Sequence, residues 1–288
     1  MKIRKVFFAL CLVVLTLFLS FSSVAVADAE MPFYDLDPKP SVLRAEFTTD
    51  YAKSSAERKH NIALAAKALN GAFIDVKAEF SFNDTVGERS AARGYENAKI
   101  IVKGKFVDGV GGGVCQVSTT LYNAAILAGL KVTEQHAHSL SVSYVEPSFD
   151  AMVNSGSADL KFVNATHNPV IIRTAADGEK LTVRVYGEKM REKIRRKSVI
   201  KEYVDAPMEK IIDEKLEYPD LYEGEERVVS YGKKGIKSEG YVIIDKNGKR
   251  TSEKLRSDYY APISGQVVVG TAIKEKSFFD FFFPLIFY

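Results

Sequence analysis

A glycine-rich turn that leads into an apolar helical segment is the feature that most constrains this chain. Gly111, Gly112 and Gly113 precede Cys115, and apolar residues then recur at helical spacing as far as Ala128. Glycine tolerates positive φ and close backbone approach, while the apolar repeat predicts a helix with one buried face. We therefore expect Cys115 at or near a helix N-terminus, where unpaired N–H groups and the helix dipole lower the pKa of a thiol.

The first 27 residues have the form of a secretory signal. Three basic residues precede a long uncharged run, and this run closes on the small residues Ala25-Val26-Ala27. The run is also long enough to span a bilayer, so an uncleaved N-terminal anchor is the alternative. Both interpretations predict a protein that is secreted or held in the cell envelope.

The charge balance argues against nucleic acid as a partner. The chain has 40 basic and 37 acidic residues, and three of the basic ones lie in the leader, so the remainder is neutral. A neutral chain lacks the basic surplus that nucleic-acid binding uses. Without the leader and its Cys11, Cys115 is the only cysteine. A lone thiol in an exported protein is either buried and inert or kept for its reactivity.

The remaining chain, about 260 residues, is long enough for two domains. A proline-containing lead-in over residues 28–46 is expected to be extended. A helix capped at Ser54-Ser55 is expected to end before Gly71. β-type runs then cover 73–76, 79–82 and 99–107.

Residues 131–145 alternate with period two, which predicts a strand that carries His136 and His138 on its apolar face. Further strands are expected over 160–164, 169–174 and 180–186. The segment 188–197 is charged throughout, which indicates a linker.

Beyond that linker, residues 198–272 show short β-type runs punctuated by glycine, including a hairpin signal at Asn247-Gly248. They predict an elongated all-β module. The apolar tail, residues 273–288, is too short to cross a membrane; packing on a domain, contact with a bilayer surface and binding of a partner are the alternatives.

Several motifs resemble the VanW-like domain. These are the Phe80-Ser81-Phe82-Asn83 block, the run from Gly111 to Gln116 with the following Ser-Thr-Thr-Leu-Tyr-Asn, His138-Ser139, and Asp150-Ala151. The resemblance covers roughly residues 47–187, although Val76-Lys77-Ala78 and Ser148-Phe149 replace glycine-containing turns of the family pattern.

Residues 198–272 resemble a G5 domain. The two resemblances imply an α+β VanW-like domain followed by an elongated all-β G5-like module, in a cell-wall-associated protein. The VanW-like family takes its name from a glycopeptide-resistance gene cluster. The G5 resemblance implies binding to peptidoglycan or another glycan that contains N-acetylglucosamine, and Tyr231, Tyr241, Tyr259 and Tyr260 are the candidate sugar contacts.

Two interpretations of Cys115 stay open, so the sequence leaves open whether the protein is an enzyme. In the first, Cys115 is a nucleophile, His138 or His136 is its base, and Asp150 or Glu134 orients the base. Backbone N–H groups of residues 114–116 would stabilise an oxyanion. Peptidoglycan stem peptides would then be the substrates of acyl transfer or hydrolysis.

In the second interpretation, Cys115 is a small buried hydrophobe, and the VanW-like domain binds a partner or maintains the cell wall without chemistry. A third arrangement would use Cys115, His136 and His138 as zinc ligands, but no second cysteine supports it. We therefore expect no metal and no cofactor.

Overall fold

The computed structural model describes residues 42–102 and 104–273. The expected leader over residues 1–27, residues 28–41 of the expected lead-in and all but the first residue of the apolar tail lie outside this range. Within the described residues, no helix combines the length and apolar character needed to cross a membrane.

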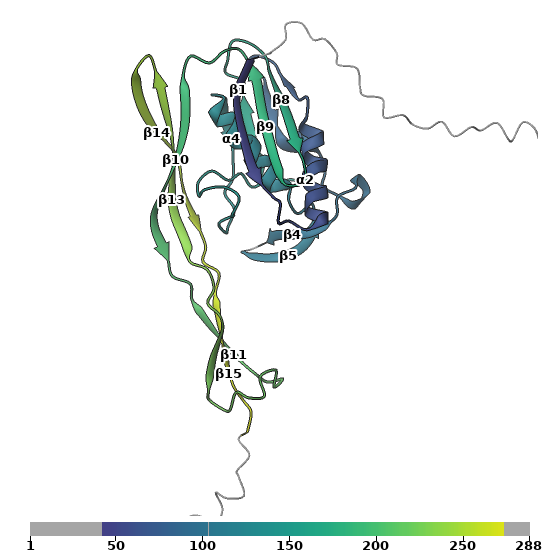
Figure 1. The fold of residues 1–288 in the computed structure, drawn as a ribbon, viewed down its shortest axis with the longest axis vertical. Coiled ribbons are helices and arrows are strands. Elements are labelled where there is room, and N and C mark those ends of the chain that lie inside the picture. Colours follow the sequence, from purple (N-terminus) through teal and green to yellow (C-terminus); the bar gives the residue numbers. More distant parts are fainter. Residues whose placement is uncertain (1–41, 103, 274–288) are drawn as a thin grey trace, which may run out of the picture. The chain divides into compact units, whose positions relative to one another are not determined.

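A four-stranded antiparallel sheet forms one side of the first domain. Its order is β1 (Val42–Asp50), β9 (Lys180–Gly187), β8 (Val170–Ala176) and β2 (Phe73–Ile74). Alternate residues of β9 are buried, so the sheet turns one face to the core. The expected strands over 169–174 and 180–186 are thereby confirmed, and Figure 1 shows these strands beside the helices that cover them.

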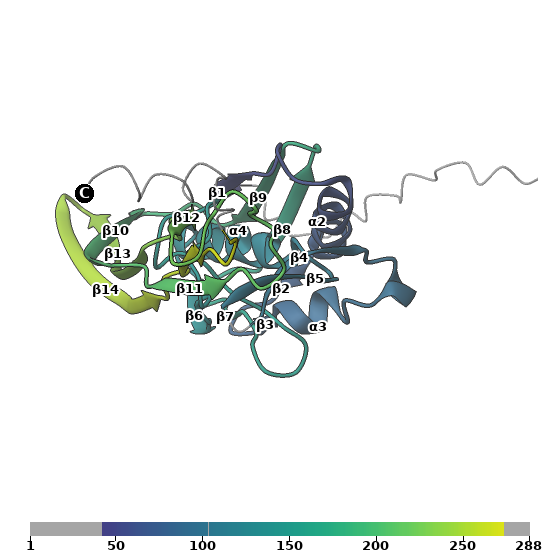
Figure 2. The ribbon, with the colours of Figure 1, turned by 90° about the horizontal axis from the view of Figure 1, so that it is seen from below.

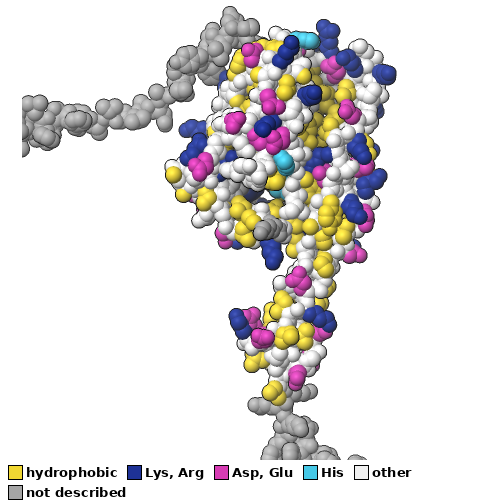
Figure 3. All heavy atoms as spheres, turned by 180° about the vertical axis from the view of Figure 1, so that it is seen from behind, with side chains coloured by type: hydrophobic (Ala, Val, Ile, Leu, Met, Phe, Trp, Pro, Cys, Tyr) yellow, Lys and Arg dark blue, Asp and Glu magenta, His cyan; other side chains and the backbone are white. Residues whose placement is uncertain are grey.

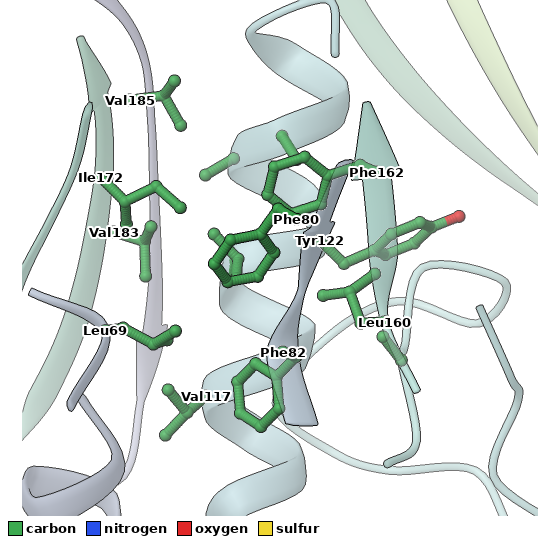
Figure 4. Close-up of a cluster of buried hydrophobic side chains, with 14 of the residues drawn as sticks. Leu69, Phe80, Phe82, Val117, Tyr122, Leu160, Phe162, Ile172, Val183 and Val185 are labelled. Atoms are coloured by element: carbon green, nitrogen blue, oxygen red, sulfur yellow. The ribbon is translucent and has the colours of Figure 1, made fainter. Parts of the chain in front are cut away.

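Helix α4 (Val114–Leu127) runs through the centre of this domain. One side contacts β1 and β9, and another contacts β6 (Lys131–Glu134) of a small sheet. That sheet has the order β3 (Glu79–Ser81), β7 (Lys161–Val163), β6. Figure 2 shows α4 between the two sheets, and Figure 4 shows the side chains that fill both spaces. Phe80 and Phe162 stack there with ring centroids 4.7 Å apart.

Helix α2 (Ala56–Leu69) packs on β8 and α4. Ser55 caps it by accepting a hydrogen bond from the Arg58 N–H, and the buried stripe includes Ile62, Ala65 and Leu69. The predicted helix is confirmed. A short helix α3 (Phe82–Val86) and the 3₁₀ turn η1 (Ala91–Arg93) follow it.

Two strand predictions need correction. The run expected over 99–107 is a hairpin of β4 (Asn97–Val102) and β5 (Lys105–Val110), because the chain reverses between the two strands. The strand expected over 131–145 ends at Glu134. Beyond it, His136 forms only an isolated bridge with Met152, so the ladder does not continue and period two no longer decides which side chains share a face.

The second domain is built entirely from strands and turns between residues 193 and 273. One sheet has the order β10 (Lys193–Val204), β13 (Gly235–Lys246), β14 (Lys249–Tyr260) and is antiparallel. The other has the order β11 (Met208–Ile212), β15 (Gly265–Val269), β12 (Glu226–Ser230), with β11 parallel to β15. Asn247 and Gly248 both have positive φ, as the predicted hairpin turn requires.

The strand boundaries differ from the expected segment boundaries at two places. β1 begins at Val42, inside the segment expected to be an extended lead-in, because residues 42–46 pair with β9. β10 begins at Lys193, inside the expected charged linker. The charged side chains of this segment lie on a strand that pairs with β13, so charge alone did not mark a linker here.

Candidate functional site

The glycine turn brings the start of α4 into close contact with α2 and β4. Gly113 is the N-cap with φ of 111°, a conformation that residues with a side chain rarely adopt. A Cβ on Gly112 would lie 2.8 Å from the carbonyl carbon of Ala98. Both positions therefore need glycine, and together they place Cys115 as the second residue of the helix.

Cys115 is partly buried and faces His138 and Arg89. Its Sγ lies 3.3 Å from the carbonyl oxygen of Val153, to which the neutral thiol donates. Burial alone would raise the pKa of the thiol, but the hydrogen bond and positive charge of His138, with the charge of Arg89, lower it overall. The surroundings therefore favour the thiolate.

His138 is 5% exposed and lies in the loop after β6. Its Nδ1 is 2.7 Å from Oδ2 of Asp150, and its backbone N–H donates to the same oxygen at 2.7 Å. Because Asp150 occupies Nδ1, the other ring nitrogen is left for the thiol of Cys115. Burial would lower the pKa of His138, but the hydrogen bonds to Asp150 and Cys115 raise it to about 9. The lowered pKa of Cys115 and the raised pKa of His138 both favour a thiolate–imidazolium pair over a neutral thiol and imidazole.

The second domain holds the carboxylate of Asp150. The Tyr260 hydroxyl donates to Oδ1 at 2.6 Å, and Arg256 donates to the same atom at 3.2 Å and to the Asp150 carbonyl at 2.9 Å. Asp150 is only 1% exposed. Burial raises its pKa, but His138, Arg256 and Tyr260 outweigh burial and lower it, so the carboxylate stays ionised.

Buried polar side chains of α4 fix the backbone on either side of Asp150. Ser118 donates to the carbonyl of Ala151 at 2.6 Å, and Thr119 accepts from the N–H of Ala151 at 2.9 Å. Asn123 donates to the carbonyl of Phe149 at 2.8 Å. The helix that carries Cys115 therefore also positions the residue that orients His138.

The structure separates the two histidines. The Nε2–H of His136 donates to Oε1 of Glu134 at 2.9 Å, and the His136 side chain is 39% exposed. The pKa of Glu134 falls to about 2 because Lys161 and His136 hydrogen-bond to it. His136 and Glu134 thus form a pair of their own, while His138 and Asp150 are with Cys115. Within the described residues, no group of three or more His, Cys, Asp or Glu side chains is arranged to hold a metal ion.

The N–H groups expected to stabilise an oxyanion are mostly occupied. Val114 donates to the carbonyl of Gly111 at 3.1 Å, and Gln116 donates to the carbonyl of Gly113 at 2.9 Å. Among the described residues, this leaves the N–H of Cys115 itself without a carbonyl acceptor. The buried side chain of Gln116 bonds to Arg58 and to the end of β1, so it braces the site.

Cys115 and His138 line an open groove of about 990 Å3. Its walls are the β4–β5 hairpin, the loops 137–144 and 152–155, and Lys233 and Tyr259 of the second domain. Sequence reasoning missed Arg58 and Arg89, which also line the groove, because these two residues belong to no motif. Tyr144, a third lining residue, belongs to the Tyr144-Val145 pair that resembles the VanW-like domain, but it was given no role in the site.

The four tyrosines suggested as sugar contacts differ in exposure. Tyr231 is 82% exposed and Tyr259 53% exposed, whereas Tyr260 is buried against Asp150. Tyr260 is therefore unavailable to a glycan, and Tyr241 is partly buried with its hydroxyl on Glu239. Figure 3 shows a face on which basic and acidic side chains are interspersed, in keeping with the neutral charge balance.

Two protein-family models match parts of this chain. The family model described as VanW like protein matches residues 57–186, and the G5 domain model matches residues 195–272. YoaR of Bacillus subtilis is 42% identical over 141 residues, which is 49% of this chain and 46% of YoaR. The vancomycin B-type resistance protein VanW of Enterococcus faecalis is 30% identical over 135 residues, 45% of this chain and 49% of that protein. The matches span about half the length of these curated relatives.

Two solved structures are similar to the second domain. The G5 domain of IgA1 protease is 28% identical, with a TM-score of 0.21, over 28% of this chain and 92% of that one. The HP0197-G5 crystal structure is 20% identical, with a TM-score of 0.18, over 28% of this chain and all of that one. The Cys115 site lies within the residues that the VanW like protein model matches, and the residues that the G5 domain model matches follow it.

Proposed function

We propose that this is an exported cell-envelope protein whose VanW-like domain is a cysteine-dependent acyl transferase or peptidase acting on peptidoglycan stem peptides. In this proposal the G5 domain binds cell-wall glycan and holds the first domain near its substrate. The observation that carries the catalytic part is the Cys115–His138–Asp150 arrangement at the floor of an open groove.

Each of these residues has a defined part in the proposed reaction. The Cys115 thiolate attacks the carbonyl carbon of the substrate amide, and the Cys115 N–H donates to the developing oxyanion. The imidazolium of His138 gives its proton to the leaving amine as the C–N bond breaks, which produces a thioester. Water or a second amine then attacks the thioester, His138 accepts the proton, and the C–S bond breaks to restore the thiolate.

Asp150 keeps its charge throughout this cycle. It holds His138 in the tautomer with Nδ1–H and stabilises the imidazolium. The hydrogen bonds from Tyr260 and Arg256 prevent the carboxylate from rotating away. His138 is thereby oriented for proton transfer before substrate binds.

The cell-wall assignment rests on separate observations. The expected secretory signal supports export of the chain, and a relative is named as a vancomycin resistance protein. The exposed rings of Tyr231 and Tyr259 offer apolar faces of the kind that sugars stack on. The matched G5 region contains both tyrosines.

The test is the rate of alkylation of Cys115 by iodoacetamide as a function of pH. We would use the full-length chain with Cys11→Ser, so that Cys115 is the only thiol. Because the pKa of Cys115 is lowered and that of His138 is about 9, we expect a reactive plateau well below pH 8.5. Above pH 9 the imidazolium is lost, so alkylation rises further while acyl transfer falls.

His138→Ala should remove the low-pH plateau and shift reactivity toward the ordinary thiol pKa of about 8.5. His136→Ala is the matched control and should leave the profile unchanged, because His136 pairs with Glu134. Stem peptides should be turned over by the parent and not by Cys115→Ser. An ordinary pH profile in the parent would instead mean a structural cysteine in a binding module.

A further inference from the structure

The groove beside Cys115 has an unbalanced charge. Four basic side chains line it, and none of its described lining residues is acidic; the basic ones are Arg58, Arg89, Lys99 and Lys233. Lys99 is paired with Asp108 at 2.9 Å on the exposed hairpin. The other three form no ion pair with any described carboxylate, which leaves a net positive groove.

Arg89 is the groove arginine whose charge acts on the Cys115 thiol and lowers its pKa. Its guanidinium donates to the Asn83 side chain at 2.8 Å and to the Gly87 carbonyl at 3.1 Å, both neutral acceptors. Burial lowers its pKa, and the negative charges of Cys115, Tyr95 and Asp159 oppose that shift. A partly buried cation without a carboxylate against it is electrostatically costly, and an anionic ligand would offset the cost.

Arg58 approaches the groove from α2. It donates to Gln116 Oε1 at 2.7 Å and to the Ser54 hydroxyl at 3.2 Å, so its position is fixed by neutral partners too. Both arginines therefore have fixed positions and line the groove, and among the described residues neither Nη1 of Arg58 nor Nη2 of Arg89 forms a hydrogen bond. The planar guanidinium fork matches the two oxygens of a carboxylate.

We infer that this groove recognises a substrate with a free carboxylate, held by Arg58 and Arg89 next to the bond that Cys115 attacks. The inference rests on the proposed function, which states that Cys115 attacks an amide bond of the substrate. The binding of the carboxylate itself does not require catalysis. The other titratable groups that face the groove are Cys115, His138, Tyr144, Lys99, Lys233 and Tyr259.

Two alkylating reagents of nearly the same size test the inference. Iodoacetate carries a carboxylate and iodoacetamide does not, so the ratio of their rate constants at Cys115 reports attraction of an anion. Any change in thiolate population alters both rates equally and cancels. We would measure this ratio in the full-length Cys11→Ser chain at pH 7 and low ionic strength.

We expect Arg58→Gln and Arg89→Gln each to lower the iodoacetate to iodoacetamide ratio by about three- to tenfold, the size of one lost charge at short range. Lys99→Gln removes a charge that is already paired and exposed, and should change the ratio less than twofold. Arg58→Lys keeps the charge and guards against misfolding of the Arg58→Gln variant. An unchanged ratio in Arg89→Gln and Arg58→Gln would overturn the inference.

A second arm identifies the anion. N-acetylalanine should slow alkylation by iodoacetamide, and N-acetylalaninamide, which lacks the free carboxylate, should not. If inorganic phosphate protects as well as N-acetylalanine, the site is a general anion site and the carboxylate assignment fails. Failure of the proposed catalysis would appear elsewhere, as an ordinary pH profile or absent peptide turnover.

Discussion

At the scale of single residues, Asp150 joins the two domains. Its carboxylate accepts hydrogen bonds from His138 of the first domain and from Tyr260 and Arg256 of the second. The groups that face it are thus one imidazole, one guanidinium and one phenol. The pKa of Tyr260 is raised by burial and by the neighbouring charge of Asp150, so the phenol remains a donor.

Removing that phenol should change the titration of the site. In Tyr260→Phe, Asp150 loses a hydrogen bond of 2.6 Å that lowers its pKa, so its carboxylate becomes a stronger acceptor for the imidazolium. The upper edge of the alkylation plateau should therefore move above pH 9. The free energy of unfolding should fall by about 1.5–3 kcal/mol, the range for a hydrogen bond to a charged group. Tyr259→Phe, the exposed neighbour, is the control for both measurements. An upper edge that stays at pH 9 would show that Tyr260 does not affect how strongly Asp150 holds the imidazolium.

The sequence was informative about part of this site. The glycine turn placed Cys115 at a helix start, and the resemblance to the VanW-like domain singled out His138 and Asp150. It left His136 and Glu134 as alternatives, because period two assumes a continuous strand. Arg256 and Tyr260 were not predicted, since they reach Asp150 only through packing between domains that are far apart in sequence.

At the scale of elements, α4 both carries the thiol and holds the segment that contains Asp150. Its apolar stripe was predicted, and Val117, Leu121, Ala124 and Ala125 are fully buried. Its polar residues are buried as well, which an amphipathic pattern does not reveal. Ser118, Thr119 and Asn123 are buried under the segment 149–151, which uses their hydrogen bonds. Gln116 and Thr120 bond instead to the end of β1.

Ser118→Ala should therefore affect stability and reactivity together. It removes the bond of 2.6 Å to the Ala151 carbonyl and leaves that oxygen, among the described residues, only the longer bond of 3.4 Å from Thr119. We expect a loss of about 1–3 kcal/mol in urea unfolding, the cost of a poorly satisfied buried acceptor. Displacement of Asp150 should also slow alkylation on the low-pH plateau. Thr120→Val, on the same helix but bonded to Thr49, should lose stability and keep the reactivity. Equal effects of both variants on the plateau would contradict this role for Ser118.

At the scale of the whole described chain, the sheet β10-β13-β14 is packed on the first domain. The Ser148 and Ser238 hydroxyls are 2.8 Å apart, Val242 belongs to the hydrophobic core, and Arg196 lies over the rings of Phe47 and Phe149. The α+β class of the first region and the all-β class of the second were predicted from the sequence, but nothing in the sequence indicated that the two regions share a core. Such packing depends on surfaces that are assembled from distant segments.

Gly240 is the position at which this packing can be tested. A Cβ there would lie 2.9 Å from the carbonyl oxygen of Ser148, so Gly240→Val should push the sheet away from the loop that carries Asp150. We expect the parent to unfold in one transition by fluorescence and by circular dichroism, and the variant to show two, with slower alkylation at pH 7. Ser252→Val, at an exposed position of the same sheet, should behave as the parent. A single transition in Gly240→Val would argue against a shared core.

The hydrogen bonds between Asp150 and β14 also determine when, during synthesis of the chain, the site can be completed. Cys115, His138 and Asp150 are synthesised well before Arg256 and Tyr260, which lie near the end of the described chain. The carboxylate therefore lacks two of its donors until β14 has been synthesised and has paired with β13. We expect the thiol to become fully reactive only after this strand has formed, and not in a shorter nascent chain.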